Sequence, residues 1–443
     1  MLHREIHLWV REFFCFYVQF KLSTTNNIQI GTIVTSDDDD ELRSELDSWG
    51  YNCFEYDDEA LLTQAVTMIA MMKFDIQFNV RVPVMRRFAI EIRKQYLNNP
   101  YHNFRHGVDV MQSVFWMSRK IDFERHLPSV EMFALLTAAL SHDVGHPGTN
   151  NAFLVNTSSP LALRYNDLSV LENMHASIMF ITMGGKSEED NTMNIFSGMS
   201  KTDFIIARKT AIKSILMTDN SHHFKCINDI KVMLEVHQDK HERGDSIFID
   251  SEKQRMFLCG LLLHVSDISN PMRHWKASSK AAFNVMEEFF LQGDQEKKRN
   301  MKVSMLCDRE KENIPKSQMG FIDFFVSPLT EQFLNLFPEC GTDFATELVA
   351  NRLRWQNMYI TTLDAKEQDV KGKELREKYD GWKKKWETYL DDGHEVADVK
   401  VDEEAMGTMQ KLKSGLVKRM SIVKMMGSGS SSGNSRSNSG EKK

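Results

Sequence analysis

The stretch Ala138-Ala139-Leu140-Ser141-His142-Asp143-Val144-Gly145-His146-Pro147-Gly148 decides the fold. An apolar run over 133–140 leads into it, which predicts a buried helix carrying His142 and Asp143 at its end. An imidazole beside a carboxylate suits an ion that accepts mixed nitrogen and oxygen ligands, such as Zn²⁺ or Mn²⁺. His146 follows four residues after His142, so a continuing helix would place both on one face. The alternative is a polar helix end without a metal.

Outward from this stretch, the pattern of apolar residues predicts helices. Glycine and proline are scarce between residues 60 and 397, and strand-like alternation is rare. Long amphipathic segments recur at 108–121, 130–143, 203–217, 224–237, 252–268, 276–292, 317–337 and 342–363. We therefore expect one large all-α domain over 48–397. Residues 1–47 are expected to be a peripheral segment with an acidic linker at 37–40, and residues 398–443 a basic amphipathic stretch followed by a disordered Ser/Gly-rich tail.

The composition is that of an ordinary globular protein. Of 443 residues, 42% are hydrophobic and 26% charged, and the net charge of −7 argues against a nucleic-acid-binding surface. The six cysteines are scattered without a close pair, which favours reduced thiols and a cytoplasmic protein. No run of about 20 apolar residues predicts a membrane-spanning helix.

Four further stretches carry candidate functional side chains. His102 and His106 are four residues apart, which predicts a shared helical face, with one imidazole on a metal and the other toward a substrate. Glu172 and His175 are three apart and could hold water or orient a ligand. The alternatives are two surface imidazoles in the first case and a structural Glu–His hydrogen bond in the second.

The other two stretches lie further along the chain. Asp267 directly follows a strongly apolar segment over 260–266, which predicts that its carboxylate is buried. A buried carboxylate is costly unless it is paired or binds a metal. Gln318 and Phe321 share a face, and an amide beside an aromatic ring suits a flat heterocycle. The alternatives are a helix cap or salt bridge for Asp267 and simple core packing for the pair.

The order and spacing of these stretches resemble the class I cyclic nucleotide phosphodiesterases of eukaryotes over about residues 48–395. The motifs that carry the resemblance are Tyr101-His102-Asn103-x-x-His106, His142-Asp143-x-x-His146-Pro-Gly-x-Asn-Asn, Leu171-Glu172-Asn173, Met217-Thr218-Asp219, Ser266-Asp267-Ile268-Ser269-Asn270-Pro271, Glu287-Glu288-Phe289 and Ser317-Gln318-x-Gly-Phe321. The resemblance implies an HD-type phosphodiesterase catalytic domain that hydrolyses 3′,5′-cyclic nucleotides to 5′-nucleoside monophosphates. We assign no subfamily.

The resemblance also implies a role for each site residue. The ligands of a tight Zn²⁺ site would be His106, His142, Asp143 and Asp267. Asp143 would also reach a second ion, Mg²⁺ or Mn²⁺, whose waters would contact His146, Glu172, His175 and Thr218. His102 would be the general acid, oriented by Glu288. The substrate would be held by Tyr101, Asn270, Val285, Gln318 and Phe321, with Gln318 hydrogen-bonded to the purine.

Two departures from the family pattern concern neighbours of the site. Met174 stands where the family commonly has a histidine, and Asn220 stands where a methionine often follows Met-Thr-Asp. Neither removes a predicted metal ligand, so we expect an active enzyme. Two other interpretations remain: a metal phosphohydrolase acting on nucleotide mono- or triphosphates, and an inactive regulator that binds cyclic nucleotide.

The sequence does not fix cAMP against cGMP, because an amide such as that of Gln318 can present either orientation to a purine. Asn270 resembles the residue of several cAMP-preferring branches and favours cAMP. The basic stretch over 410–426 could bind an anionic membrane or a partner groove, or be a solvated extension. The sequence decides neither whether this stretch associates with a membrane nor whether the protein forms a homodimer.

Overall fold

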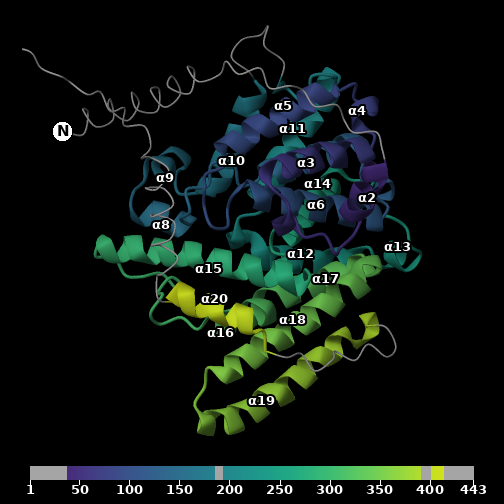
Figure 1. The fold of residues 1–443 in the computed structure, drawn as a ribbon. Coiled ribbons are helices and arrows are strands. Elements are labelled where there is room, and N and C mark those ends of the chain that lie inside the picture. The colour runs from purple at the N-terminus through teal and green to yellow at the C-terminus, as the bar shows by residue number, and fades with distance from the viewer. Residues whose placement is uncertain (1–36, 185–192, 391–400, 414–443) are drawn as a thin grey trace, which may run out of the picture. The chain divides into compact units, whose positions relative to one another are not determined.

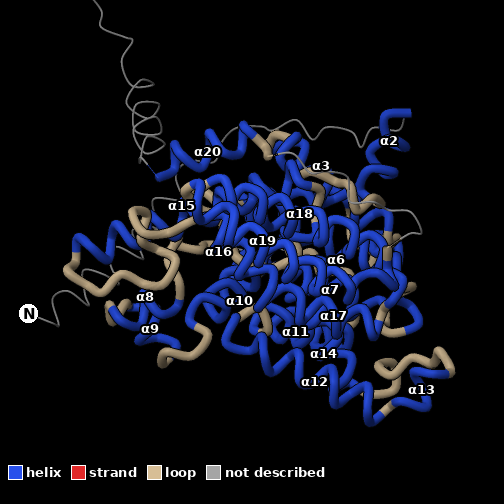
Figure 2. The backbone as a smooth tube through the Cα atoms, turned by 90° about the horizontal axis from the view of Figure 1, so that it is seen from below, coloured by secondary structure: helices blue, strands red, loops and turns tan. Residues whose placement is uncertain are grey.

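The computed structural model describes residues 37–184, 193–390 and 401–413. Within these ranges the chain consists of helices joined by loops, without a β-strand (Figures 1 and 2). The all-α fold predicted from the sequence is therefore confirmed. The contacts divide the chain after Asp40, and the helices from α3 to α20 all belong to the part from Glu41 onward. In the described ranges, no helix is both long enough and apolar enough to cross a membrane.

The described part of the chain is a succession of α-helices. The first half contains α2 (Asp37–Leu46), α3 (Asp58–Met71), α4 (Phe74–Gln77), α5 (Val82–Gln95), α6 (Phe104–Lys120), α7 (Ser129–Ser141), α8 (Asn151–Asn156), α9 (Pro160–Tyr165), α10 (Val170–Met183) and α11 (Lys201–Leu216). The second half contains α12 (His223–Val236), α13 (Gln238–Glu242), α14 (Glu252–Asp267), α15 (Trp275–Lys298), α16 (Ile314–Phe321), α17 (Ser327–Leu336), α18 (Gly341–Thr361), α19 (Ala365–Lys383) and α20 (Glu403–Lys413).

Two helices form the centre of the core and lead to the candidate site. Helix α7 buries every residue from Val130 to Ser141 and packs against α6 and α11. Helix α14 is buried over most of its length and packs against α11, α6 and α7. A helix that is apolar on all sides is stable only when other elements surround it. Each of these helices therefore carries the residue at its carboxyl end, His142 or Asp267, deep into the protein.

The predicted amphipathic segments correspond to helices, with one interruption. The segment 317–337 is divided by a π-helical turn, Ile322–Val326, between α16 and α17. Helix α19 was missed because its sequence is highly charged and only Gly372 and Tyr379 are buried in it. The short helices α8 and α9 and the longer α10 were also absent from the predicted segments.

Both predicted terminal segments contain helix. Helix α2 begins at Asp37, so the acidic run is helical where the sequence predicted a solvated linker. Helix α20 packs against α15 and buries Ala405, Met409 and Leu412. A guanidinium nitrogen of Arg309 donates to the Leu412 carbonyl at 2.7 Å.

Leu412 belongs to the basic stretch 410–426, for which a membrane, a partner groove and a solvated extension are the alternatives, and its side chain is buried in the fold. The remainder of the basic stretch and the Ser/Gly-rich tail, from residue 414, lie outside the described residues, as do residues 1–36. The boundaries at 47/48 and 397/398 stay predictions.

Candidate active site

The His-Asp pair lies at the end of α7, where the helix stops earlier than predicted. Helix α7 ends at Ser141, and His142 caps it. The ring nitrogen Nδ1 of His142 lies 2.8 Å from the Ala139 carbonyl oxygen, which leaves Nε2 to face the interior. Gly145 has a φ of +81°, a left-handed conformation that glycine adopts without strain. The chain therefore turns, and the prediction that His142 and His146 share a face of one helix is wrong.

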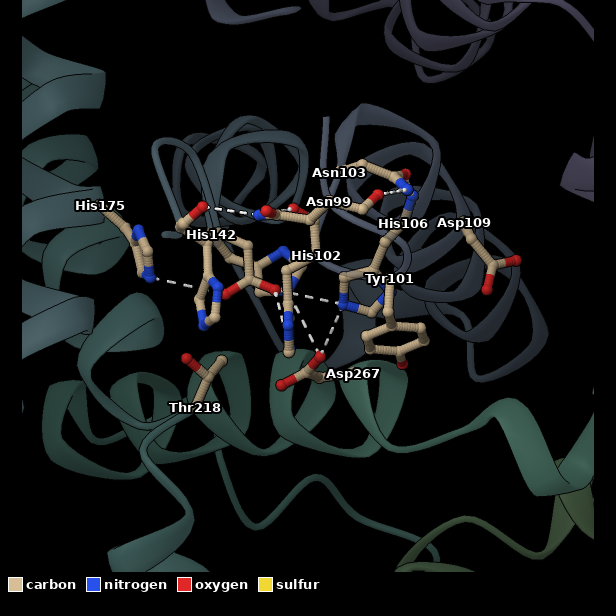
Figure 3. A network of polar contacts seen from close by, with 12 residues as sticks. Asn99, Tyr101, His102, Asn103, His106, Asp109, His142, His175, Thr218 and Asp267 are labelled. Atoms are coloured by element: carbon tan, nitrogen blue, oxygen red, sulfur yellow. Dashed lines mark hydrogen bonds and ion pairs between the residues drawn. The ribbon is translucent and has the colours of Figure 1, made fainter. Parts of the chain in front are cut away.

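Four side chains converge on a common point: those of His106 from α6, of Asp267 from α14, and of His142 and Asp143 from the carboxyl end of α7. Figure 3 labels three of them, His106, His142 and Asp267. The Nε2 atoms of His106 and His142 each lie 3.0–3.3 Å from one oxygen of Asp143 and one oxygen of Asp267. Tetrahedral ligands with bonds of about 2.0–2.1 Å to an ion are about 3.4 Å apart from one another. The spacing and the mixed nitrogen and oxygen donors therefore fit a divalent metal ion. All four residues were predicted as its ligands.

The charges in this cluster also favour a bound cation. Burial raises the pKa of Asp143, but the His142 and His102 imidazoles outweigh it and hold that pKa well below its usual range. Burial lowers the pKa of His142, and the carboxylates of Asp143 and Asp267 outweigh it and raise that pKa well above its usual value. The cluster thus keeps two carboxylates ionised in a buried place. A divalent cation would take over this neutralisation and release protons from the imidazoles.

The second oxygen of Asp143 faces another group of predicted residues. Its Oδ1 atom lies 3.6 Å from Nε2 of His175, whose Nδ1 is 2.8 Å from the Val144 carbonyl oxygen. Glu172 and His175 lie on α10, as their spacing predicted. Burial raises the pKa of Glu172 to about 7, although the amide of Asn151 donates to both carboxylate oxygens. Glu172 and His175 line the same cavity as Asp143, together with two other predicted residues, His146 and Thr218.

His102 precedes α6 rather than lying on it. The helix begins at Phe104 with Asn103 as its cap, so the predicted helical face shared by His102 and His106 is wrong. The loop nevertheless brings the two rings to a centroid distance of 5.8 Å. Nε2 of His102 faces the cluster, 4.0 Å from an oxygen of Asp143.

Glu288, on α15, holds the loop that carries His102. Its Oε1 pairs with Nδ1 of His102, and its Oε2 accepts from the backbone N–H groups of Tyr101 and His102, each at 3.0 Å. Burial lowers the pKa of His102, but the carboxylates of Glu288 and Asp143 outweigh it and raise that pKa to about 9. The imidazolium form is therefore favoured, with a proton on Nε2 directed at the cluster.

A cavity of about 460 Å³ opens beside these groups. It is in the size range of small-molecule sites. The predicted substrate-binding residues all line it: Tyr101, Asn270, Val285, Gln318 and Phe321. Val285 comes from α15, and Gln318 and Phe321 come from α16. The amide and the aromatic ring thus line the same cavity as His102, Asp143 and Asp267, which could act on a phosphate.

Three residues that position the site were not among the predicted site residues. Asn99 joins the two loops, because its side-chain nitrogen donates to the carbonyls of His102 at 3.0 Å and His146 at 2.6 Å. Asn151 holds Glu172, and Asp109 binds the amide of Asn270 at 3.2 Å. Asn151 stood in a quoted motif, whereas nothing in the pattern distinguished Asn99 or Asp109 from surface residues.

The fold and the cluster define an all-α domain of the HD type with a divalent-metal site at a buried helix end. Residues 101–346 match the family described as 3′5′-cyclic nucleotide phosphodiesterase, and the chain belongs to that family. A 3′,5′-cyclic-AMP phosphodiesterase isoform of Drosophila melanogaster is 34% identical over 76% of this chain and 50% of its own length. A dual 3′,5′-cyclic-AMP and -GMP phosphodiesterase of Plasmodium falciparum is 34% identical over 66% of this chain and 24% of its own.

The chain thus spans half or less of these two relatives. The solved structures that resemble it include the phosphodiesterase domain of a rhodopsin phosphodiesterase from the choanoflagellate Salpingoeca rosetta. That structure has a TM-score of 0.66 and 28% identity, and the match covers 78% of this chain and all of the other. A second structure of this domain has a TM-score of 0.65 and 29% identity, over 72% of this chain and 97% of the other. The resemblance inferred from the sequence is therefore confirmed at the level of family and fold.

Proposed function

We propose that this protein hydrolyses 3′,5′-cyclic nucleotides to 5′-nucleoside monophosphates in a metal-dependent reaction and so ends cyclic nucleotide signals. The observation that carries the proposal is the common position of a four-ligand cluster, the Nε2 atom of His102 facing it, and a cavity lined by Gln318 and Phe321. The family membership and the names of the relatives support the same activity.

We assign the tight site to Zn²⁺, because two imidazoles and two carboxylates suit that ion in tetrahedral geometry. The second site, Mg²⁺ or Mn²⁺, is assigned to the free oxygen of Asp143, with waters held by His146, Glu172, His175 and Thr218. Bound divalent ions would supply an activated water and neutralise phosphate charge.

The chain's own residues account for the rest of the reaction. Gln318 hydrogen-bonds to the purine edge, and Phe321 and Val285 hold its two faces, so the phosphate is placed beside the cluster. A water molecule loses one proton to the solvent and attacks phosphorus, and the bond to the 3′ oxygen breaks. His102 donates the proton on Nε2 to that oxygen, which would otherwise leave as an alkoxide. Glu288 keeps the imidazole charged and correctly turned.

Of the two cyclic nucleotides, we favour cAMP as the preferred substrate. Asn270 lines the cavity, and its side chain is already held by Tyr101 and Asp109. The relative from Drosophila melanogaster is named for cAMP, whereas that from Plasmodium falciparum is named for both nucleotides.

The test is product analysis with the purified chain, cleared of metal by a chelator and supplied with Zn²⁺ and Mg²⁺. We expect 5′-AMP from cAMP, a lower rate with cGMP, and no turnover of p-nitrophenyl phosphate or of nucleoside triphosphates. Release of phosphate from these last compounds, without turnover of cAMP, would favour the alternative metal phosphohydrolase. Tight metal and cAMP binding without a product would favour the inactive regulator.

A further inference from the structure

Helix α20 is fastened to the rest of the domain at both of its ends. It lies along α15, against which it buries Met409 and Leu412 (Figure 1). Just before its amino end, a carboxylate oxygen of Asp402 accepts from Nε1 of Trp275, the first residue of α15, at 2.7 Å. At its carboxyl end, Nη1 of Arg309 donates to the Leu412 carbonyl oxygen at 2.7 Å. The last carbonyls of a helix have no partner within it, and the helix dipole favours a cation beside them.

Arg309 belongs to the loop 299–313, which joins α15 to α16. Its Nη1 also donates to Oε2 of Glu287 on α15 at 2.7 Å, and its guanidinium lies 5.0 Å from the centre of the Phe290 ring. Arg309 and Glu287 are both buried. A buried ion pair holds its two groups together, because separating them leaves an uncompensated buried charge. One guanidinium nitrogen therefore connects the loop, the middle of α15 and the carboxyl end of α20.

The same loop forms part of the cavity wall through Leu306. Leu306 has a φ of +67°, a left-handed conformation that is costly for a bulky side chain and persists only where its surroundings fix it. Before Leu306, the backbone N–H of Ser304 donates to Oε2 of Glu296 on α15 at 2.7 Å. After it, the Cys307 carbonyl packs on Gly293 of α15 so closely that a Cβ atom there would clash with it. The place of Leu306 in the wall therefore depends on how the loop is held against α15.

We propose that Arg309 is a positioning residue for substrate binding, which ties the loop to α20 so that docking of α20 on α15 keeps Leu306 against the bound nucleotide. Neither Arg309 nor any described residue of α20 lines the cavity, so both act on the substrate through the loop. Release of α20 from α15 therefore weakens substrate binding without touching the metal ligands. This inference rests on the proposed function.

Two substitutions in the full chain release α20 in different ways. Arg309→Met removes the guanidinium and keeps an unbranched side chain, whereas Met409→Asp places a carboxylate on the buried face of α20. We expect each to raise KM for cAMP by about 3- to 10-fold, as for a partly lost leucine contact, with kcat and the metal content retained. Hydrogen exchange at the amides of 403–413 and of 304–307 should become faster in both variants, also without nucleotide.

A matched control and a double variant separate positioning from simple destabilisation. Gln410→Asp adds the same charge to the same helix as Met409→Asp, but at an exposed position. It should leave KM and the exchange of both segments unchanged. In a Leu306→Ala background, which already lacks the contact with the nucleotide, Met409→Asp should have no further effect on KM.

An unchanged KM in Met409→Asp, or an equal rise in KM with and without Leu306, would overturn the inference. If Arg309→Met does not fold, Met409→Asp decides the question by itself. Absence of cAMP turnover by the unmodified chain would instead overturn the proposed function. The exchange of 304–307 would still test the connection between α20 and the loop, so the two failures are distinguishable.

Discussion

At the scale of single residues, hydrogen bonds made away from the site decide which atoms face it. Nδ1 of His142 is hydrogen-bonded to the Ala139 carbonyl oxygen, and Nδ1 of His175 is hydrogen-bonded to the Val144 carbonyl oxygen. Nδ1 of His102 is taken by Glu288. In all three imidazoles Nε2 is therefore left to face the cluster, which is the orientation that each role requires.

The assignment of His102 as the general acid predicts a loss of rate without a loss of metal. His102→Ala should lower kcat for the cyclic nucleotide by about 10²- to 10⁴-fold, the range usual for general acid catalysis. Metal content, measured on the same preparation, should not change, because Nε2 of His106 and not of His102 makes the short contacts to both carboxylates. Loss of metal from this variant would show that His102, and not His106, binds the ion.

The pairing with Glu288 predicts a shift in the pH profile. Glu288 raises the pKa of His102, and only the protonated form can act as the acid. Glu288→Gln removes the charge and should lower that pKa, so the fall of kcat/KM at alkaline pH should begin at a lower pH. An alkaline limb at the same pH in both proteins would contradict the role given to Glu288.

Single residues also show what the sequence could and could not reveal. The set His106, His142, Asp143 and Asp267 was predictable from the resemblance of its motifs to the phosphodiesterase family, and His142, Asp143 and Asp267 also follow apolar runs. The role of Asp109 was not, because it depends on Asn270, 161 residues away. His146 was predicted on a continuing helix, but α7 ends at Ser141 and the chain turns at Gly145 before it reaches His146.

At the scale of elements, the site depends on the close approach of α6 to the end of α7. Gly107, next to His106, permits this approach. A Cβ atom at Gly107 would lie 2.7 Å from the Tyr96 hydroxyl oxygen and 2.9 Å from the Leu140 carbonyl oxygen. The backbone at Leu140 belongs to a buried helix and cannot easily move.

Gly107→Ala should therefore force the two helices apart. We expect a loss of about 1–3 kcal/mol in the free energy of unfolding, as is usual for overpacking, and a weaker hold on the metal. Urea unfolding and metal titration measure the two effects. Gly381→Ala is the matched control, since nothing lies within 4 Å of its Cβ position and alanine should stabilise a helix interior by about 0.5–1 kcal/mol. Unchanged stability and metal affinity in Gly107→Ala would contradict this packing argument.

The elements that the sequence predicted well are those whose apolar residues form a clear face or a continuous run. Helix α14 was predicted over 252–268 and observed over Glu252–Asp267. Helix α19 was missed because charged residues dominate it and its packing on α18 leaves little apolar signal. The burial of α20 against α15 could not be foreseen, because a short amphipathic segment does not specify its partner.

At the scale of the whole molecule, a buried histidine pair links stability to pH. His223 and His264 are buried, with Nδ1 of His223 3.0 Å from Nε2 of His264. Burial and the neighbouring His264 lower the pKa of His223 from 6.5 to about 4, and burial also lowers the pKa of His264. The unfolded chain therefore binds these protons more readily than the folded one.

The free energy of unfolding should be insensitive to this pair above about pH 6.5 and fall as the pH drops from there to about 4. A fall in the pKa of His223 from 6.5 to about 4 corresponds to at most about 3 kcal/mol in the free energy of unfolding. Urea unfolding of the chelated protein at several pH values measures it without a contribution from metal release. His223→Asn should make this fall less steep without abolishing it, because burial also lowers the pKa of His175 to about 4. An equally steep fall in that variant would contradict the assignment.

The central claim is that the His–Asp cluster holds the metal on which cyclic nucleotide hydrolysis depends. Asp267→Ala tests it most directly, because Asp267 lies within 3.3 Å of both imidazoles and reaches the cluster from a separate helix. The measurement is bound metal per chain together with cAMP turnover, on the variant and the unmodified protein side by side. We predict that the variant loses the tightly bound ion and its activity together, while a variant with the full metal content and full turnover would contradict the claim.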